Sequence, residues 1–444
     1  MFDDRSSLSR TPHHAVALDC LEAAIEAAAP DRAAREAVAR DGETLRVGDS
    51  EYDLTAYREV VVVGGGKASV GVARVITEVL DDRLTDGVVV AEHPDTLDTV
   101  SVRVGDHPVP SERTVTATAA VLETVRAADA STLVLFVVTG GASALLTAPA
   151  GDLSLADLRA TTTGLLESGA PIEAVNAVRK HLSAIKGGQL ARLAAPATVV
   201  TFALSDVVGN DLSVVGSGPT VPDETTYADT LDVLDRYDVA VPAAVRTHLE
   251  AGAAGDVRET PGVGDAAFDR AETHLVGTNS EALESAAAAA ADAGYDPLLL
   301  TSRLRGPARH VGPTVLSVAE EIAATGNPVS PPAVVVAGGE TTVTIDGGGG
   351  RGGPNQELAL AVALELDGPA VFAAVDTDGE DGSSDAAGAM VDSETVPDGE
   401  RRRANEALRG HDAGGYLDGV AATLYTGPTG TNVNDVVVVV IPEP

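Results

Sequence analysis

The sequence has no tryptophan, a single cysteine and few aromatic residues, which make up 3% of its 444 positions. The lone Cys20 excludes a disulfide within the chain and favours a reducing compartment. No apolar run approaches the roughly 18 residues that a membrane-spanning helix needs. The first residues also lack the basic-then-apolar pattern of a signal peptide. We therefore predict a soluble, cytoplasmic protein that has no membrane partner.

Basic residues are scarce as well. Thirty Lys and Arg face 67 Asp and Glu, for a formal net charge of -37. The acids are spread along the whole chain, so nucleic acid is a poor partner. A protein whose surface is dense in carboxylates stays soluble where molar salt screens the repulsion between them. We predict a halophilic protein; the alternative is an acidic enzyme from an ordinary-salt environment.

Lysine is the rarest of the basic residues and occurs only at Lys67, Lys180 and Lys186. All three lie in segments marked by Gly or Ser. Since salt adaptation has removed lysine nearly everywhere else, we interpret the three that remain as candidate functional residues.

Short β-branched runs alternate with small-residue loops and helical stretches. This pattern predicts an α/β fold with a mostly parallel sheet, whose ligands lie outside the carboxyl ends of the strands. Thr11 and Pro12 predict the start of a helix that Pro30 ends, and one long helical region is predicted over 155–193. The predicted strands include Val60–Val63, Val88–Val90, Leu133–Val138, Val199–Leu204, Val334–Ala337 and Val371–Val375.

The segment 64–69 follows the first of these strands and has the features of a phosphate-binding turn. It would offer bare backbone N–H groups, a helix N-terminus and a lysine, with Gly65, Gly66 and Ser69 as contacts. It is not a Walker A loop, because Ala68 follows the lysine, and Ser69 replaces the third glycine of a dinucleotide fingerprint. A tight structural turn explains the segment equally well.

Two further loops exclude other chemistry. The segment 141–145 lacks the closing glycine of a nucleophile elbow, and no histidine is well placed near it, which argues against an acyl hydrolase. The segment 376–382 is not an EF-hand loop, since Asp381 stands where that loop needs glycine. Carboxylates at a strand end suit Mg²⁺ or substrate hydroxyls, which makes Asp376 and Asp378 candidate metal ligands. Salt-adapted surface acids are the equal alternative.

A third group of candidates lies on one predicted helical stretch and consists of Asn176, Arg179, Lys180, Ser183 and Lys186. Arg179, Ser183 and Lys186 are three or four residues apart and would share one face of the helix. Such a face in an acidic protein is suited to a carboxylate or a phosphate. Ion pairs with Glu173 are the alternative.

Taken together, ten ordered blocks resemble the glycerate kinase family whose C-terminal part is called the MOFRL domain. The resemblance covers nearly the whole chain, from the first helix to the last strand. The blocks are 65–69, 107–110, 139–146, 176–188, 205–211, 216–220, 338–342, 355–358, 377–379 and 427–435.

The resemblance implies two α/β domains, a Rossmann-like domain over 1–235 and a MOFRL domain over 236–444. Each would have a largely parallel sheet flanked by helices, with the active site in the cleft between the domains. It also implies ATP-dependent phosphorylation of D-glycerate, most often at the 2-hydroxyl to give 2-phosphoglycerate, with Mg²⁺. We expect a monomer or homodimer. The alternatives are phosphorylation at the 3-hydroxyl, an NAD(P)H-dependent hydroxypyruvate reductase, and a non-catalytic sensor.

The resemblance also implies roles for particular residues. It makes Lys67 central to catalysis, and we expect Asp206 to act on the metal or the substrate hydroxyl. The residues that the blocks place in substrate or nucleotide binding also include Gly141, Ser143, Asn210, Glu340, Asn355, Glu357, Thr429 and Asn432.

One departure from the family concerns Pro354, which stands where relatives commonly have an arginine that is regarded as catalytic. Pro354 fits the first position of a helix, where a missing N–H costs nothing. Arg351 lies three residues earlier in the glycine-rich segment 347–353, which we expect to be flexible. We predict that Arg351 supplies the missing positive charge.

Overall fold

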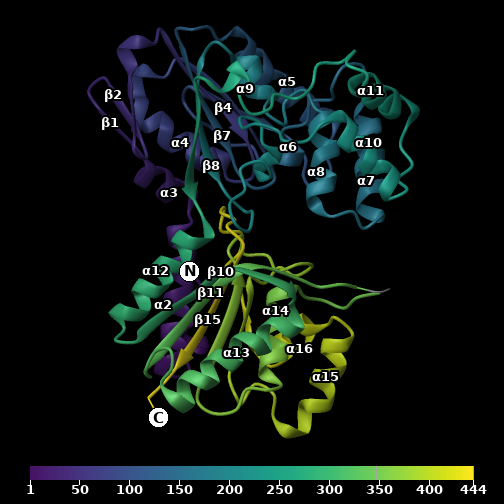
Figure 1. The fold of residues 1–444 in the computed structure, drawn as a ribbon. Coiled ribbons are helices and arrows are strands. Elements are labelled where there is room, and N and C mark those ends of the chain that lie inside the picture. Colours follow the sequence, from purple (N-terminus) through teal and green to yellow (C-terminus); the bar gives the residue numbers. More distant parts are fainter. Residues whose placement is uncertain (346–347, 444) are drawn as a thin grey trace. The chain divides into compact units, whose positions relative to one another are not determined.

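The computed structural model describes residues 1–345 and 348–443, and the chain forms two compact units (Figure 1). One, here called the parallel-sheet unit, is Ala33–Val276. The other, the mixed-sheet unit, combines Met1–Arg32 with Gly277–Pro444. Both are α/β, as the sequence predicts.

This division differs from the predicted boundary between residues 235 and 236. Helix α2 (Pro12–Ala27) belongs with the C-terminal part because it packs against α12 (Asn279–Asp292) and β15 (Asp435–Ile441). Residues 236–276 stay with the parallel-sheet unit, since α11 (Ala243–Ala253) packs on its helices and its sheet extends to the strand that ends at Gly277.

The parallel-sheet unit contains a small three-stranded antiparallel sheet and a six-stranded sheet. Its strands are β1 (Val38–Asp41), β2 (Thr44–Val47), β3 (Ser50–Asp53), β4 (Glu59–Gly65), β5 (Asp86–Ala91), β6 (Val100–Val104), β7 (Thr132–Val138), β8 (Thr198–Leu204) and β9 (Ala271–Gly277). Its other helices are α3 (Pro30–Ala37), α4 (Ser69–Leu80), α5 (Glu112–Ala127), α6 (Ala142–Leu145), α7 (Leu155–Glu167), α8 (Ile172–His181), α9 (Gln189–Ala194) and α10 (Tyr227–Arg236).

The six strands have the order β6-β5-β4-β7-β8-β9, and the pairs from β6 to β8 are parallel. This is the order of a doubly wound, Rossmann-type sheet. In such a sheet the order in which the strands are added reverses between the first and the fourth strand, here β4 and β7. Successive side chains of β4 pack into two different hydrophobic cores, one on each face of the sheet. Val61 and Val63 pack with α5, whereas Val60 and Val62 pack with α4. The sheet is therefore buried on both faces, as its continuous apolar strands predict.

The helical stretch predicted over 155–193 is three helices, α7, α8 and α9. Pro171 caps the start of α8, and Gly188, with φ 75°, caps the start of α9. A proline and a left-handed glycine both interrupt a continuous helix. Helices α7, α8, α10 and α11 share a separate small core around Leu165, Val178 and Tyr227.

The mixed-sheet unit has the strand order β10-β11-β15-β12-β13-β14. The strands other than β15 are β10 (Asp296–Pro307), β11 (Ala333–Thr342), β12 (Val371–Asp376), β13 (Gly388–Val391) and β14 (Thr423–Leu424). The helices other than α2 and α12 are α1 (Arg5–Leu8), α13 (Ala308–Thr325), α14 (Pro354–Ala363), α15 (Arg401–Arg409) and α16 (Ala413–Gly419).

A largely parallel sheet was predicted for this part of the chain too, and that detail is wrong. Among the described residues β10 and β11 pair in parallel, but β15 lies antiparallel between β11 and β12, and β13 and β14 continue antiparallel. Antiparallel strands can be neighbours without a crossover helix between them. The run of valines in β15 does not indicate in which direction the strand lies in the sheet.

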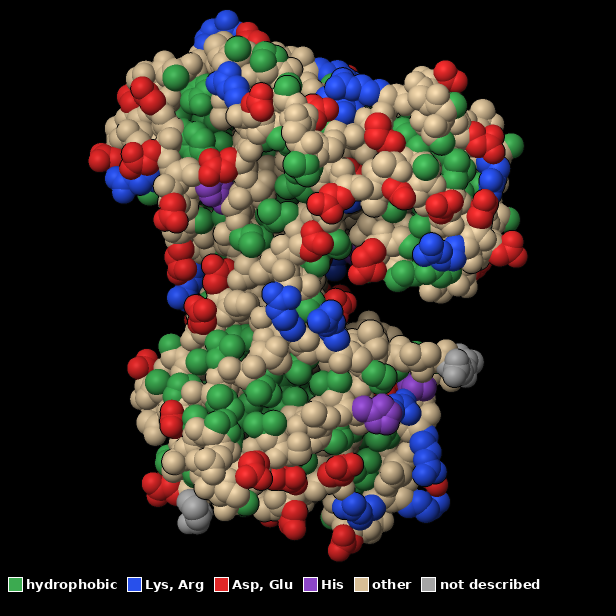
Figure 2. All heavy atoms as spheres, viewed as in Figure 1, with side chains coloured by type: hydrophobic (Ala, Val, Ile, Leu, Met, Phe, Trp, Pro, Cys, Tyr) green, Lys and Arg blue, Asp and Glu red, His purple; other side chains and the backbone are tan. Residues whose placement is uncertain are grey.

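Asp and Glu side chains are scattered over the visible face of each unit rather than gathered in one patch (Figure 2). Within the described residues, no helix has both the length and the apolar character required to cross a bilayer.

Candidate functional site

Two glycine loops follow β4 and β7, and they are bonded to each other. The Lys67 N–H donates to the Gly140 carbonyl at 2.8 Å, and the Ala68 N–H donates to Thr139 Oγ1 at 3.1 Å. Gly66 has φ 136°, and a Cβ there would lie 2.2 Å from Thr139 Oγ1, so only glycine allows this approach. The loops thus meet where the strand order reverses, the place where open α/β sheets bind ligands.

The first loop does not form the predicted cradle of bare N–H groups. Each backbone N–H of residues 66–69 donates a hydrogen bond to another group of the chain. The Gly66 N–H donates to the Val90 carbonyl, and the Ser69 N–H donates to the Gly66 carbonyl. The Ser69 hydroxyl is buried and donates to the same two carbonyls, and a Cβ on Gly65 would meet Leu146. We therefore assign Gly65, Gly66 and Ser69 to holding the loop, which leaves its lysine as the group facing solvent.

Lys67 is exposed and lies beside two titratable side chains of the same unit. A Cβ on Gly141 would be 3.2 Å from Lys67 Cγ and 3.3 Å from His107 Cδ2, so both side chains lie against this glycine. Burial and the charge of Lys67 lower the pKa of His107. A Cβ on Gly140 would be 2.6 Å from Asp206 Oδ2. Burial raises the pKa of Asp206, and the Lys67 charge opposes this shift.

The structure thus brings Lys67 and Asp206 together and adds His107, which sequence reasoning did not single out as a site residue. Its Nδ1 lies 3.5 Å from a Glu92 carboxylate oxygen, at the end of β5. The available signal was the His-Pro-Val-Pro block at 107–110, which was noted only as part of the resemblance.

A cavity of about 440 Å³ opens beside this cluster, lined by 107–110, 141–148 and helices α7 and α8. Its polar lining includes His107, Gly141, Ser143, Arg179, Ser183 and Lys186. Arg179, Ser183 and Lys186 therefore line the same cavity, although they do not share a helical face as predicted. Helix α8 ends at His181, so the serine and that lysine reach the cavity from the turns that follow it.

Two cations face this cavity. Lys186 is buried, and its Nζ donates to the Leu146 carbonyl at 2.8 Å. Burial and the neighbouring Arg179 charge lower the pKa of Lys186 to about 7. Arg179 is partly exposed to the cavity, and it has no ion pair with a carboxylate of the described residues. Neither side chain pairs with a carboxylate in the part of the chain that the structure describes, so in a chain of charge -37 they are a candidate site for an anion.

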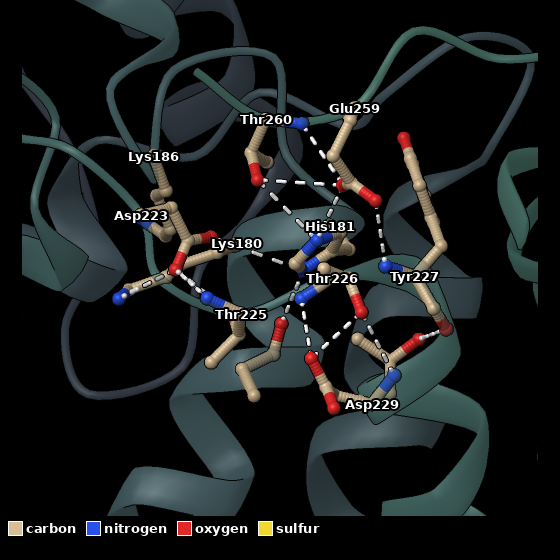
Figure 3. Close-up of polar contacts among 12 residues, drawn as sticks. Lys180, His181, Lys186, Asp223, Thr225, Thr226, Tyr227, Asp229, Glu259 and Thr260 are labelled. Atoms are coloured by element: carbon tan, nitrogen blue, oxygen red, sulfur yellow. Dashed lines mark hydrogen bonds and ion pairs between the residues drawn. The ribbon is translucent and has the colours of Figure 1, made fainter. Parts of the chain in front are cut away.

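Lys180 has a different role from the one predicted. Its Nζ lies 3.2 Å from Asp223 Oδ1 in a buried pair, and Lys180 does not line the cavity. Figure 3 shows this pair beside His181, whose Nε2 lies 2.8 Å from Glu259 Oε1. The carboxylate of Glu259 also accepts from the N–H of Tyr227, at the start of α10. These contacts tie α8 to its neighbours, and no ion pair with Glu173 is present among the described residues.

The remaining candidates of the parallel-sheet unit are polar groups of its loops. Ser217 Oγ lies 3.0 Å from Ser143 Oγ and 3.5 Å from Asn176 Oδ1, so these three form a chain at the cavity wall. Asn210 has φ 58° and is partly exposed in the loop after β8.

In the mixed-sheet unit, Asp376 is the last residue of β12, and Asp378 lies two residues beyond it. Burial and the charges of Asp435 and Asp378 raise the pKa of Asp376 well above its usual value, and burial raises the pKa of Asp435 to about 7. Crowded carboxylates of this kind favour a bound cation. The described residues contain no group of three or more His, Cys, Asp or Glu side chains that could hold a metal. Asp376 and Asp378 offer oxygen donors of the kind that Mg²⁺ prefers, and they would hold it as one or two carboxylates rather than as a complete protein cage.

Pro354 is the first residue of α14, as predicted, but the start of this helix is already capped by the chain. Asp381 accepts from the N–H groups of Asn355 and Gln356 at 2.9 and 2.8 Å. Asn355 Nδ2 also donates to Asp435 at 2.7 Å. Asp381, which was not among the predicted site residues, is thus the group at this helix N-terminus.

Arg351 is held more firmly than a flexible segment would allow. Its guanidinium lies 2.8 Å from Asp385 and 3.2 Å from Asp418, and its backbone bonds to Asp412 and Gly414. Hydrogen bonds to Asp385 and Tyr425 raise the pKa of Arg351. The expected flexibility of 347–353 does not apply to the anchored part from 350 to 353, and Gly347 lies outside the described residues.

Four other predicted binding residues have partners within the mixed-sheet unit. Both oxygens of Glu357 are occupied, one by Arg309 at 2.8 Å and the other by His411 at 2.9 Å. Asn434 donates to Glu340 at 3.2 Å. Thr429 and Asn432 tie the loop 427–434 to the end of β12, through Thr377 O and Asp378 Oδ2. Glu357 thus links α14 to α13 and to His411, and it is buried.

The Rossmann-type strand order and the two basic side chains facing a cavity define an α/β protein with a candidate site for a small ligand beyond the ends of its strands. Residues 16–250 match the family described as a domain of unknown function (DUF4147), and residues 333–435 match the MOFRL family. The glycerate 2-kinase of Pyrococcus horikoshii is 39% identical over 94% of this chain and 95% of its own.

A putative hydroxypyruvate reductase of Agrobacterium vitis is 41% identical over 86% of this chain and 87% of its own. The crystal structure of glycerate kinase from Thermotoga maritima superposes with a TM-score of 0.84, at 35% identity, and covers 96% of this chain and 98% of that one. The chain belongs to the glycerate kinase family with a MOFRL domain.

Proposed function

We propose that the protein transfers the terminal phosphoryl group of ATP to the 2-hydroxyl of D-glycerate and yields 2-phosphoglycerate. The observation that carries this proposal is the pair of unneutralised cations, Arg179 and Lys186, in a cavity beside Lys67. Phosphoryl transfer needs little covalent help from a protein and depends on positioning and on positive charge around the moving group. The names of the Pyrococcus and Thermotoga relatives support the same reaction.

Each candidate group has a defined task in this reaction. The glycerate oxygen forms a bond to the γ-phosphorus, the bond to the β,γ-bridging oxygen breaks, and ADP leaves. Asp206 accepts the proton of the hydroxyl, for which a raised pKa is useful. Lys67 neutralises charge on the transferred group. Mg²⁺, if held by Asp376 and Asp378, would neutralise further charge on the phosphate oxygens.

A second candidate is hydroxypyruvate reduction with a nicotinamide cofactor, which the name of the Agrobacterium relative favours. The loop at 64–69 argues against it, because its N–H groups are used inside the chain. ADP release with ATP and D-glycerate, compared with NADH oxidation with hydroxypyruvate, separates the two. Turnover in the second assay alone would overturn the kinase proposal. A cytoplasmic location and a monomeric or homodimeric state stay predictions.

The lowered pKa of Lys186 leads to a test of the anion site. At pH 8 the free amine is mostly neutral, since its pKa is about 7. An anion bound beside it favours the charged form and raises the pKa, so ADP binding at pH 8 should take up a fraction of a proton. Calorimetric titrations in buffers of different ionisation enthalpy measure this uptake.

The control for this test is Lys186→Arg, whose guanidinium stays charged throughout the pH range. It should bind ADP without proton uptake. Uptake that persists unchanged in this variant would show that another group takes the proton. The parent's affinity for ADP should also fall as the pH rises above 7, while that of the variant stays level.

We also propose that Arg351 supplies the charge that relatives place at the position of Pro354. Its ion pairs with Asp385 and Asp418 mean that it acts from a fixed position. Arg351→Ala should lower turnover at least about tenfold, or 1.4 kcal/mol, and adding Pro354→Arg should restore part of it. Asp385→Asn is the matched control, because it keeps the arginine and its contacts with Asp418 and Tyr425, and it should keep turnover. An Arg351→Ala protein with parental turnover contradicts the proposal.

A further inference from the structure

The cavity of the parallel-sheet unit is larger and more apolar than D-glycerate requires. Every carbon of this three-carbon acid carries oxygen, so it has no apolar surface to bury. The cavity measures about 440 Å³, within the range of roughly 300–1,000 Å³ for sites that enclose larger organic ligands. Its apolar lining includes Val109, Leu158, Leu165, Leu166, Val178 and Leu182. Such a lining favours a ligand with an apolar body.

Two of these side chains are exposed to an unusual degree. Val109 is 60% exposed and Leu166 is 58% exposed, although both line the cavity. They come from separate segments, the loop after β6 and the end of helix α7. A flat ring placed against them would remove their apolar surface from water, a gain of about 25 cal/mol per Å². The hydroxyls of Thr162 and Thr163 line the same wall and can bond the edge of such a ring.

The rest of the lining requires a negatively charged ligand. Arg179 and Lys186 face the cavity, and Gly141 at its wall lies against the side chain of Lys67. A ligand that satisfies the whole cavity therefore combines a flat, weakly polar ring with a chain of negative charge that extends toward Lys67. A nucleoside polyphosphate has this composition, and glycerate does not.

We propose that this cavity holds the nucleoside of ATP, with the base against Val109 and Leu166 and the phosphates at Arg179 and Lys186. The inference rests on the proposed kinase function, and it assigns the donor rather than the acceptor to the cavity. D-glycerate then binds outside it, where the transferred phosphoryl group emerges beside Lys67.

The test uses a double variant, Val109→Ser with Leu166→Gln, which removes the apolar surface without changing charge. Both positions are exposed, so the fold should be retained. The matched control is Ile172→Gln with Val263→Ser, two exposed apolar residues of the same unit that do not line the cavity. Calorimetry with ADP and with pyrophosphate separates the ring from the phosphates, and steady-state assays give KM for D-glycerate.

The double variant should bind ADP at least about tenfold more weakly, with pyrophosphate affinity and the KM for D-glycerate within about twofold of the parent. Arg179→Met should weaken both ADP and pyrophosphate, and the control should change nothing. A double variant that binds ADP like the parent overturns the inference, as does one that raises only the KM for D-glycerate. If the parent itself neither binds ADP nor phosphorylates D-glycerate, the proposed function fails instead.

Discussion

Replacing Lys67 with methionine should cut turnover at least about 100-fold, or about 2.7 kcal/mol, with little change in Tm. The side chain is exposed and lies over Gly141, so its removal leaves no cavity. The loop is held by backbone bonds to Gly140 and Thr139, which a methionine keeps. The loss should therefore fall on the transition state, where the transferred group carries most charge. Turnover and thermal unfolding, both measured in high salt, check this.

The matched control is Arg74→Met, which removes an exposed cation from helix α4, the helix that follows the lysine. Arg74 pairs with Asp95 at the surface, 2.8 Å away, and its loss should leave turnover within about twofold of the parent, as most exposed ion pairs contribute little. A Lys67→Met protein that unfolds, or that keeps most of its turnover, would exclude the catalytic assignment.

The second large effect concerns salt. With a net charge of -37 and acids scattered over both units (Figure 2), the folded state is strained by repulsion that low salt leaves unscreened. The Debye length falls from about 30 Å at 0.01 M to about 3 Å at 1 M. Raising KCl from 0.1 to 3 M should increase Tm by at least about 10 °C, which corresponds to several kcal/mol for units of this size. Activity should rise over the same range.

Sucrose is the control for this measurement, since it favours compact states without screening charge. It should raise Tm much less than KCl of equal osmolality. A Tm that does not respond to KCl would contradict the halophilic interpretation and leave an acidic protein of ordinary salt tolerance.

Much of the fold could be predicted because local chemistry determines it. Short runs of apolar residues predicted β4, β7 and β8 to within about two residues at each end, and Thr11 with Pro12 predicted the start of α2. The direction of β15 could not be predicted in this way. A buried valine strand has the same pattern in either direction, and its position between β11 and β12 is set by contacts between segments far apart in the sequence.

The site was predicted unevenly for a similar reason. The scarcity of lysine singled out all three lysines as candidates, of which Lys186 lines the cavity and Lys67 lies against Gly141 at its wall. It gave no means to separate Lys180, whose partner Asp223 is 43 residues away. The spacing of Arg179, Ser183 and Lys186 predicted one helical face, but α8 ends at His181, and the three residues line one cavity from the helix and from the turns after it. Partners of Glu357 and Arg351 lie on other elements, and such pairs leave no trace in local sequence.

The most direct test of the central claim is to identify the product formed from ATP and D-glycerate. Phosphorus NMR of the reaction, run in high salt with Mg²⁺, distinguishes a phosphoryl group on the 2-hydroxyl from one on the 3-hydroxyl by its coupling to one or two protons. We expect 2-phosphoglycerate and ADP in equal amounts. A 3-phosphoglycerate signal would correct the position, and unchanged ATP in a folded protein that oxidises NADH with hydroxypyruvate would contradict the account.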